Sequence, residues 1–102
     1  MKMYYITVNR PEEAQAISQV LLERQLAVCT NWFPIMCAYR WQGEIKSGAE
    51  VVLIVKTKAG MRKALEEVVA SQIDYTNYIA ELAVDSVNVQ FLNWLAQEVS
   101  VE

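Results

Sequence analysis

The softest candidate metal ligands in the chain are its two cysteines. Cys29 lies in an apolar stretch and could bind Cu(I), which prefers thiolate and thioether sulfur. A free cysteine in a strand more often packs as a small buried hydrophobe, and we favour that role while keeping Cys29 as the candidate metal ligand. Cys37 follows Met36, another soft ligand, but on one extended strand the two thiols would lie about 25 Å apart. They therefore cannot share an ion within one subunit, and we expect both to stay reduced.

A second group of residues combines opposite charges with an aromatic ring. Lys56, Glu50 and Trp41 could line a cleft between subunits and bind a small anion. The simpler interpretation is a structural salt bridge with aromatic packing, and the sequence leaves both open. The predicted ligand-binding residues are Cys29, Trp41, Glu50 and Lys56.

Aromatic residues gather between positions 32 and 41. They could stack a ligand, but aromatic side chains also concentrate in the cores of subunit interfaces, which is the role that we predict. The residues expected at the interface are Trp32, Tyr39 and Trp41.

The sequence does not indicate catalysis. It contains no histidine, so a serine or cysteine nucleophile would lack an imidazole base. Its glycines, Gly43, Gly48 and Gly60, form neither a phosphate-binding loop nor a dinucleotide-binding motif. Paired carboxylates occur only on helix surfaces expected to face solvent. We therefore predict no catalytic residues and a protein that is not an enzyme.

Length and charge narrow the class of protein further. The 102 residues suffice for one domain, which we expect to span residues 1–102. The net charge is −3, and the interleaved acids and bases offer no concentrated basic surface for nucleic acid. No stretch approaches the ~20 apolar residues of a membrane helix, so no membrane partner is expected. The first residues lack the apolar core and cleavage site of a secretory signal, which predicts a cytoplasmic location.

Periodicity and turn residues predict a long central hairpin. Residues 26–41 form the first arm, in which Pro34 requires a bulge or an edge position. Gln42-Gly43 supplies the turn, and Ser47-Gly48 is expected to interrupt the returning arm. The apolar run Val51–Val55 then predicts a strand that is covered on both faces.

The remaining elements flank this hairpin. Met3–Val8 reads as a strand, and Pro11 opens an amphipathic helix, where its missing N–H is not needed. A second helix begins after residues 57–60, a fourth strand covers Tyr75–Val84, and a terminal helix carries the apolar face of residues 91–99.

This order predicts an α+β fold of the ferredoxin-like type, βαββαβ with a final helix. Both main helices would cover one face of a four-stranded sheet, and the opposite face would stay open within one chain. An open face and a long aromatic hairpin are liabilities unless another subunit covers them. The sequence therefore predicts an oligomer.

Three segments resemble the CutA family of divalent-cation-tolerance proteins. Residues 39–45 followed by 50–57 resemble its central hairpin, residues 26–31 its LAACVN-type strand, and residues 91–95 its terminal Tyr-Leu-x-Trp-Leu helix. The resemblance covers nearly the whole chain in the family's order. It implies a ferredoxin-like fold, a homotrimer similar to PII signalling proteins, and a role in tolerance of copper and other divalent cations.

One region departs from the family pattern. The family's His-Pro-Tyr-Glu motif is replaced by the stretch Gln72–Ile79, in which only Tyr75 of that motif remains. The histidine and glutamates to which the resemblance would assign copper are missing, so we expect only weak metal binding and no certain cofactor. Two alternatives stay open: a PII-like sensor that binds a small molecule between subunits, and a structural or scaffolding trimer.

Overall fold

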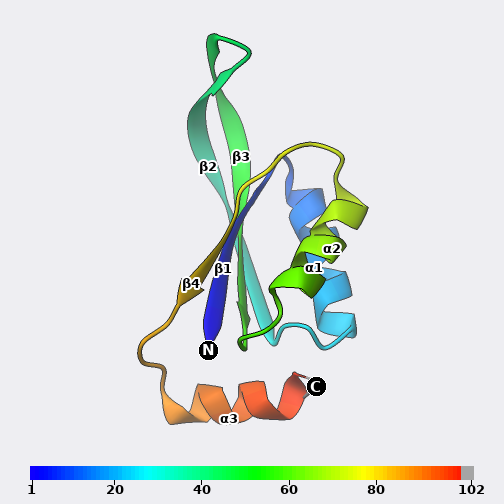
Figure 1. Ribbon diagram of the computed structural model, residues 1–102, viewed down its shortest axis with the longest axis vertical. Helices are drawn as coiled ribbons and strands as arrows, with labels where there is room; N and C mark the ends of the chain where they lie inside the picture. Colours follow the sequence, from blue (N-terminus) through cyan, green and yellow to red (C-terminus); the bar gives the residue numbers. More distant parts are fainter. Residues whose placement is uncertain (100–102) are drawn as a thin grey trace.

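Two layers make up the structure, a computed structural model that describes residues 1–99. An antiparallel sheet of four strands in the order β2-β3-β1-β4 is covered on one face by α1 and α2 (Figure 1). The elements in chain order are β1 (Lys2–Val8), α1 (Pro11–Glu23), β2 (Cys29–Trp41), β3 (Glu44–Thr57), α2 (Arg62–Gln72), β4 (Ile79–Ala83) and α3 (Val89–Glu98). The last three residues of the expected domain 1–102 lie outside the described part.

The predicted α+β class and ferredoxin-like order are confirmed. Strand β1 pairs with β3 on one side and with β4 on the other, and all three strand pairs are antiparallel. The two strands joined by each helical crossover run in the same direction but are separated by a third strand. This split arrangement keeps α1 and α2 on a single face of the sheet.

The hairpin of β2 and β3 is more regular than predicted, although its first arm begins at Cys29 and not at residue 26. Its pairing runs without a break from Cys29 opposite Lys56 to Trp41 opposite Glu44. The expected interruption at Ser47-Gly48 is wrong, because both residues stay in the ladder opposite Ala38 and Cys37. Glycine weakens a strand but leaves its extended backbone possible.

Two local predictions about the hairpin hold. Pro34 lies on the edge strand β2 opposite Val51, with no bulge in the register. The two-residue turn Gln42-Gly43 has φ values of 51° and 82°, as the tight mirror-image hairpin turns require. The hairpin extends well beyond the helices, which gives the molecule dimensions of 46 × 27 × 20 Å (Figure 1).

The fourth strand is shorter than predicted. Sequence pattern placed it at Tyr75–Val84, whereas β4 covers only Ile79–Ala83. The segment before it follows a different course because its side chains are bonded elsewhere: Tyr75 to Glu13, and Asn77 to the carbonyl of Thr7.

The core lies between the sheet and the two main helices. Tyr4, Ile6 and Val8 of β1 alternate inward and meet Val51, Leu53 and Val55 of β3. The helices contribute the buried side chains Ile17, Leu21, Leu65, Val68 and Val69.

The opposite face of the sheet is only partly covered. On this face Val52 is fully buried, but its neighbour Ile54 stays partly exposed, so β3 is not covered on both faces as predicted. Helix α3 closes one end of the sheet through Leu95 and through Val99, the residue that follows it. The rest of the open face carries exposed apolar side chains, including Phe33 at 45% and Leu82 at 41%.

Candidate functional site

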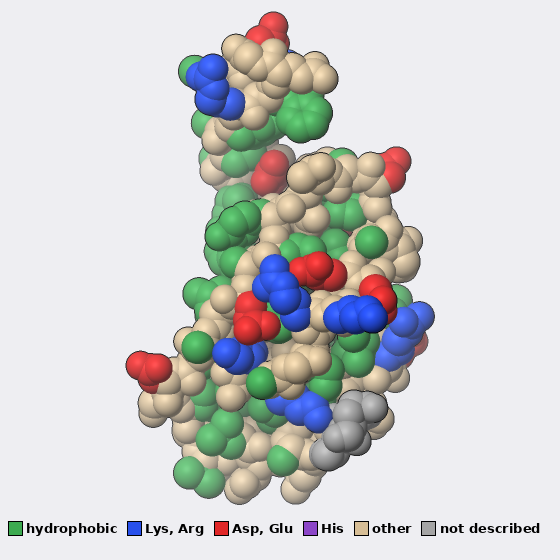
Figure 2. All heavy atoms as spheres, viewed as in Figure 1, with side chains coloured by type: hydrophobic (Ala, Val, Ile, Leu, Met, Phe, Trp, Pro, Cys, Tyr) green, Lys and Arg blue, Asp and Glu red, His purple; other side chains and the backbone are tan. Residues whose placement is uncertain are grey.

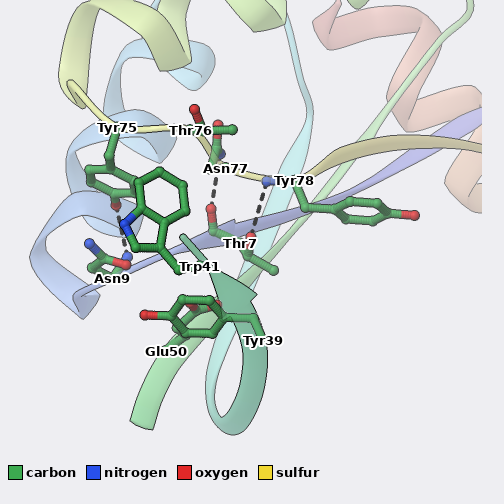
Figure 3. A pocket seen from close by; sticks show the side chains of 9 residues that line it. All are labelled: Thr7, Asn9, Tyr39, Trp41, Glu50, Tyr75, Thr76, Asn77 and Tyr78. Carbon is green, nitrogen blue, oxygen red and sulfur yellow. Dashed lines mark hydrogen bonds between the residues drawn. The ribbon is translucent and has the colours of Figure 1, made fainter. Parts of the chain in front are cut away.

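A cleft of about 440 Å³ lies where the hairpin passes the segment between α2 and β4. The space-filling view shows the end of the hairpin standing away from the body with a hollow between them (Figure 2). The lining residues come from β1 and the residue after it, from both arms of the hairpin, and from residues 75–78 (Figure 3): Thr7, Asn9, Tyr39, Trp41, Glu50, Tyr75, Thr76, Asn77 and Tyr78.

Tyr75 is fixed to the start of α1. Its hydroxyl donates a hydrogen bond of 2.6 Å to Oε1 of Glu13 and accepts one of 2.8 Å from the backbone N–H of Asn9. Glu13 also accepts from the N–H groups of Asn9 and Arg10, at 3.0 and 3.2 Å. A carboxylate that satisfies free N–H groups at a helix start stabilises the helix, and here the same carboxylate orients Tyr75.

These contacts set the protonation of both groups. Partial burial alone would raise the pKa of Glu13, but hydrogen bonds from Tyr75, Asn9 and Arg10 outweigh it and lower that pKa. Partial burial, followed by the hydrogen bond to Glu13, raises the pKa of Tyr75 to about 12. At neutral pH the pair is therefore a neutral phenol and a carboxylate.

Residues 77 and 78 are fixed to β1. Asn77 Nδ2 donates to the carbonyl of Thr7 at 2.9 Å, and the N–H of Tyr78 donates to Thr7 Oγ1 at 3.2 Å (Figure 3). The ring of Tyr78 points away from the cleft and meets the ring of Tyr5 edge-on, with 6.2 Å between centroids. Residues 75–78 therefore form a fixed wall.

The predicted ligand-binding residues separate into two places within one chain. Trp41 and Glu50 line the cleft. Cys29 and Lys56 lie opposite each other at the other end of the hairpin, where the Lys56 ammonium lies 5.9 Å from the ring centroid of Phe91. Their joint lining of a cleft between subunits stays a prediction, because it needs a second chain.

The predicted interface aromatics lie on opposite faces of the hairpin. Directly paired residues of an antiparallel ladder share a face. Trp32 pairs with the core residue Leu53 and so faces the helix side, whereas Tyr39 and Trp41 face the open side and line the cleft. All three are partly exposed, at 42%, 47% and 52% in that order, and their burial at an interface stays a prediction.

The two thiols are separate and have different neighbours. The Cys29 thiol is 3.9 Å from the side-chain oxygen of Asn31. Partial burial and a hydrogen bond to the carboxylate of Glu50 raise the pKa of the Cys37 thiol. Within residues 1–99, no group of three or more His, Cys, Asp or Glu side chains is arranged to hold a metal ion.

Sequence reasoning missed most of the polar wall of the cleft. The sequence pattern singles out Tyr75 only through its resemblance to a family motif, and it does not single out Glu13. The acid at the third helical position was a usable signal, because a residue there can reach back to the N–H groups before the helix. The contacts of Asn9, Thr7 and Asn77 depend on long-range packing and leave no local pattern.

Comparison with known proteins identifies the family. The family model described as CutA1 divalent ion tolerance protein matches residues 2–98. The chain belongs to this family. The divalent-cation tolerance protein CutA of Archaeoglobus fulgidus is 34% identical over 96 residues, covering 93% of this chain and 94% of the relative. That of Thermus thermophilus is 37% identical over 94 residues, covering 90% and 91%.

Solved structures agree with this membership. The Archaeoglobus fulgidus protein, named there a periplasmic divalent cation tolerance protein CutA, superimposes with a TM-score of 0.93 at 33% identity, over 98% of this chain and all of that one. The names of these CutA proteins describe tolerance to divalent cations and no reaction. Across residues 1–99, no helix has the length and apolar character needed to cross a membrane.

Proposed function

We propose that the chain forms a homotrimer, as one domain without catalytic activity, and contributes in that form to tolerance of divalent cations, copper among them. The main support for the homotrimer is the hairpin, which exposes apolar side chains on both of its faces. Relatives of the chain support a role in divalent-cation tolerance, since they are named divalent-cation tolerance proteins. A cytoplasmic location stays part of the proposal; the word periplasmic describes the Archaeoglobus protein.

Exposure along the hairpin supports the assembly. On the helix side, Met36 is 82% and Ile45 76% exposed, beyond the reach of α1 and α2. On the open side, Tyr39 and Trp41 are about half exposed. Apolar surface of this extent on a projecting arm favours burial against another chain.

The position of these side chains favours a ring over a two-fold dimer. A two-fold contact buries one patch against its own copy, whereas a ring joins two different surfaces of each subunit. An arm with apolar residues on opposite faces needs two neighbours, and three is the smallest ring that provides them.

We propose further that tolerance does not depend on a tight copper site within the chain. The chain has no histidine, and its two thiols lie far apart along the strand β2, with Cys29 at its start and Cys37 eight residues further on. The ligand on which the trimer acts would then be a small molecule. The cleft with Trp41 and Glu50 is the observation that favours this second role. It lies within one chain, whereas the sensor alternative expected a cleft between subunits.

Copper tolerance in cells that lack their own CutA1 protein is the test. Cells that express the chain should grow at copper concentrations that stop the parent strain. Cells that express Ile45→Lys, which alters only an exposed hairpin residue, should be less tolerant at equal protein level. If the accumulated wild-type chain gives no protection against copper, zinc or cobalt, the proposed role is wrong.

A further inference from the structure

We infer that the cleft binds a small organic cation, with the ammonium group held between aromatic rings and the carboxylate of Glu50. The inference names a ligand class for the small-molecule role proposed above. Nothing in it requires a copper site.

Aromatic rings form much of the wall of the cleft. Tyr39, Trp41 and Tyr75 line the cleft, and their rings lie toward it, whereas the ring of Tyr78 is turned away (Figure 3). The face of an aromatic ring carries negative potential, and tryptophan attracts a cation more strongly than the other aromatic residues do. Because its hydroxyl is bonded to Glu13 and Asn9, Tyr75 has a fixed orientation.

The charge of the cleft also favours a cation. Glu50 is the one charged residue among those that line it. Within residues 1–99, none of the ion pairs involves Glu50, so its charge is not balanced by a lysine or arginine of the same chain. The remaining lining groups are hydroxyls and amides, which bear no charge.

In the described part of the chain, no basic residue near the cleft supplies a free positive charge to it: Arg40, opposite Ile45 in the ladder, faces the other side of the hairpin, and two more have carboxylate partners. Lys46 lies opposite Tyr39 in the ladder, and its ammonium is 3.3 Å from the carboxylate of Glu44. Arg10 follows Asn9, and its guanidinium is 3.3 Å from Glu13. Lys56, the residue expected to attract an anion, lies opposite Cys29 at the far end of the hairpin. A cation therefore fits this cleft better than an anion does.

The walls of the cleft described above all come from one chain, and two of its residues, Tyr39 and Trp41, also belong to the surface proposed to lie at a subunit interface. Trp41 is 52% exposed, and a neighbouring subunit in the ring would add a further wall beside it. Ligand binding is therefore tested by a titration, and assembly by a separate measurement of mass.

The test is a titration followed by nuclear magnetic resonance, using the indole N–H signals of the three tryptophans. The probes are choline, its neutral isostere 3,3-dimethylbutan-1-ol, and the anion 3,3-dimethylbutanoate, all at matched ionic strength. Choline should shift the Trp41 signal and leave the signals of Trp32 and Trp94 in place. It should bind about tenfold more tightly than the neutral isostere, because only choline carries the charge.

Three variants distinguish the effect of the Glu50 charge from effects on the fold. Glu50→Gln should weaken choline binding about fivefold and leave the weak affinity for the isostere unchanged. Glu67→Gln, the same change on exposed α2, should bind as the parent does. Trp41→Leu should lose the preference for choline over the isostere.

Two results would overturn the inference. Equal shifts by choline and its isostere would show an apolar cleft without cation preference. A Trp41 shift with 3,3-dimethylbutanoate alone would show that the cleft selects anions. The small-molecule role would then stand, but the ligand class inferred here would be wrong. Sedimentation of the same samples reports the trimer independently, so failure of the assembly is not confused with failure of the ligand class.

Discussion

The hydroxyl of Tyr75 donates a hydrogen bond of 2.6 Å to the carboxylate of Glu13, a residue 62 positions earlier in the chain. The bond joins the segment after α2 to the first turn of α1, and it orients one aromatic wall of the cleft. The segment before β4 is therefore positioned by a residue in the first turn of α1.

Replacement of Tyr75 by phenylalanine should destabilise the protein by about 1 kcal/mol, because Glu13 and the N–H of Asn9 both lose a partner. Urea unfolding followed by circular dichroism measures the change. Tyr78→Phe is the matched control, since the contacts of Tyr78 shown here use its ring and backbone. Equal stabilities for the two variants would mean that the Tyr75 hydrogen bond contributes nothing.

Acid should weaken the fold through Glu13. Its pKa is lowered in the folded protein, so its stabilising contribution is complete above the ordinary pKa of about 4.5 and is lost as the pH falls through the lower folded value. Glu81 contributes in the same direction, because a hydrogen bond from Tyr4 lowers its pKa as well. Glu13→Gln should therefore remove part of the decline in unfolding free energy between pH 5 and 3. A variant with the full decline of the parent would contradict this assignment.

Removal of the Ser18 hydroxyl should leave stability unchanged or raise it by about 1 kcal/mol. Ser18 is 4% exposed, and its Oγ has no hydrogen-bond partner in the part of the chain described here. Ser71 offers a control on α2, because its hydroxyl donates to the carbonyl of Val68 at 2.6 Å. Thermal unfolding compares the stabilities of Ser18→Ala and Ser71→Ala. A clear loss of stability in Ser18→Ala alone would show that the buried hydroxyl is hydrogen-bonded.

Copper should bind the isolated protein weakly. Imidazole is the commonest protein ligand for Cu(II), and the chain has none. We expect a dissociation constant no tighter than about 10 μM in calorimetry on thiol-reduced, tag-free protein. Submicromolar stoichiometric binding would refute this, and its disappearance in Cys29→Ser would assign the site to that thiol.

Local sequence rules predicted the architecture well. The start of α1 at Pro11 and the turn at Gln42-Gly43 follow from backbone preferences of single residues. The local rules failed where long-range contacts determine the backbone conformation. Ser47-Gly48 stays extended because a complete partner strand lies beside it, and residues 75–78 leave the strand conformation because Glu13 and Thr7 bind them.

The candidate site was only half predictable for a related reason. Trp41 and Glu50 were chosen for their chemistry, and the structure places both at the cleft. Lys56 and Cys29 were chosen on the same grounds, but the register places them at the opposite end of the hairpin. Residue type suggests what a side chain can do, whereas strand register decides which side chains meet.

Sedimentation equilibrium at micromolar concentration tests the central claim, the trimer built through the hairpin, most directly. The wild-type chain should give three times 11.6 kDa. Ile45→Lys should give a lower mass with an unchanged circular dichroism spectrum, because this side chain is 76% exposed in the single chain and its replacement costs the fold little. Lys63→Glu, on the outer surface of α2, should remain at the wild-type mass. A wild-type mass of one or two chains would contradict the account.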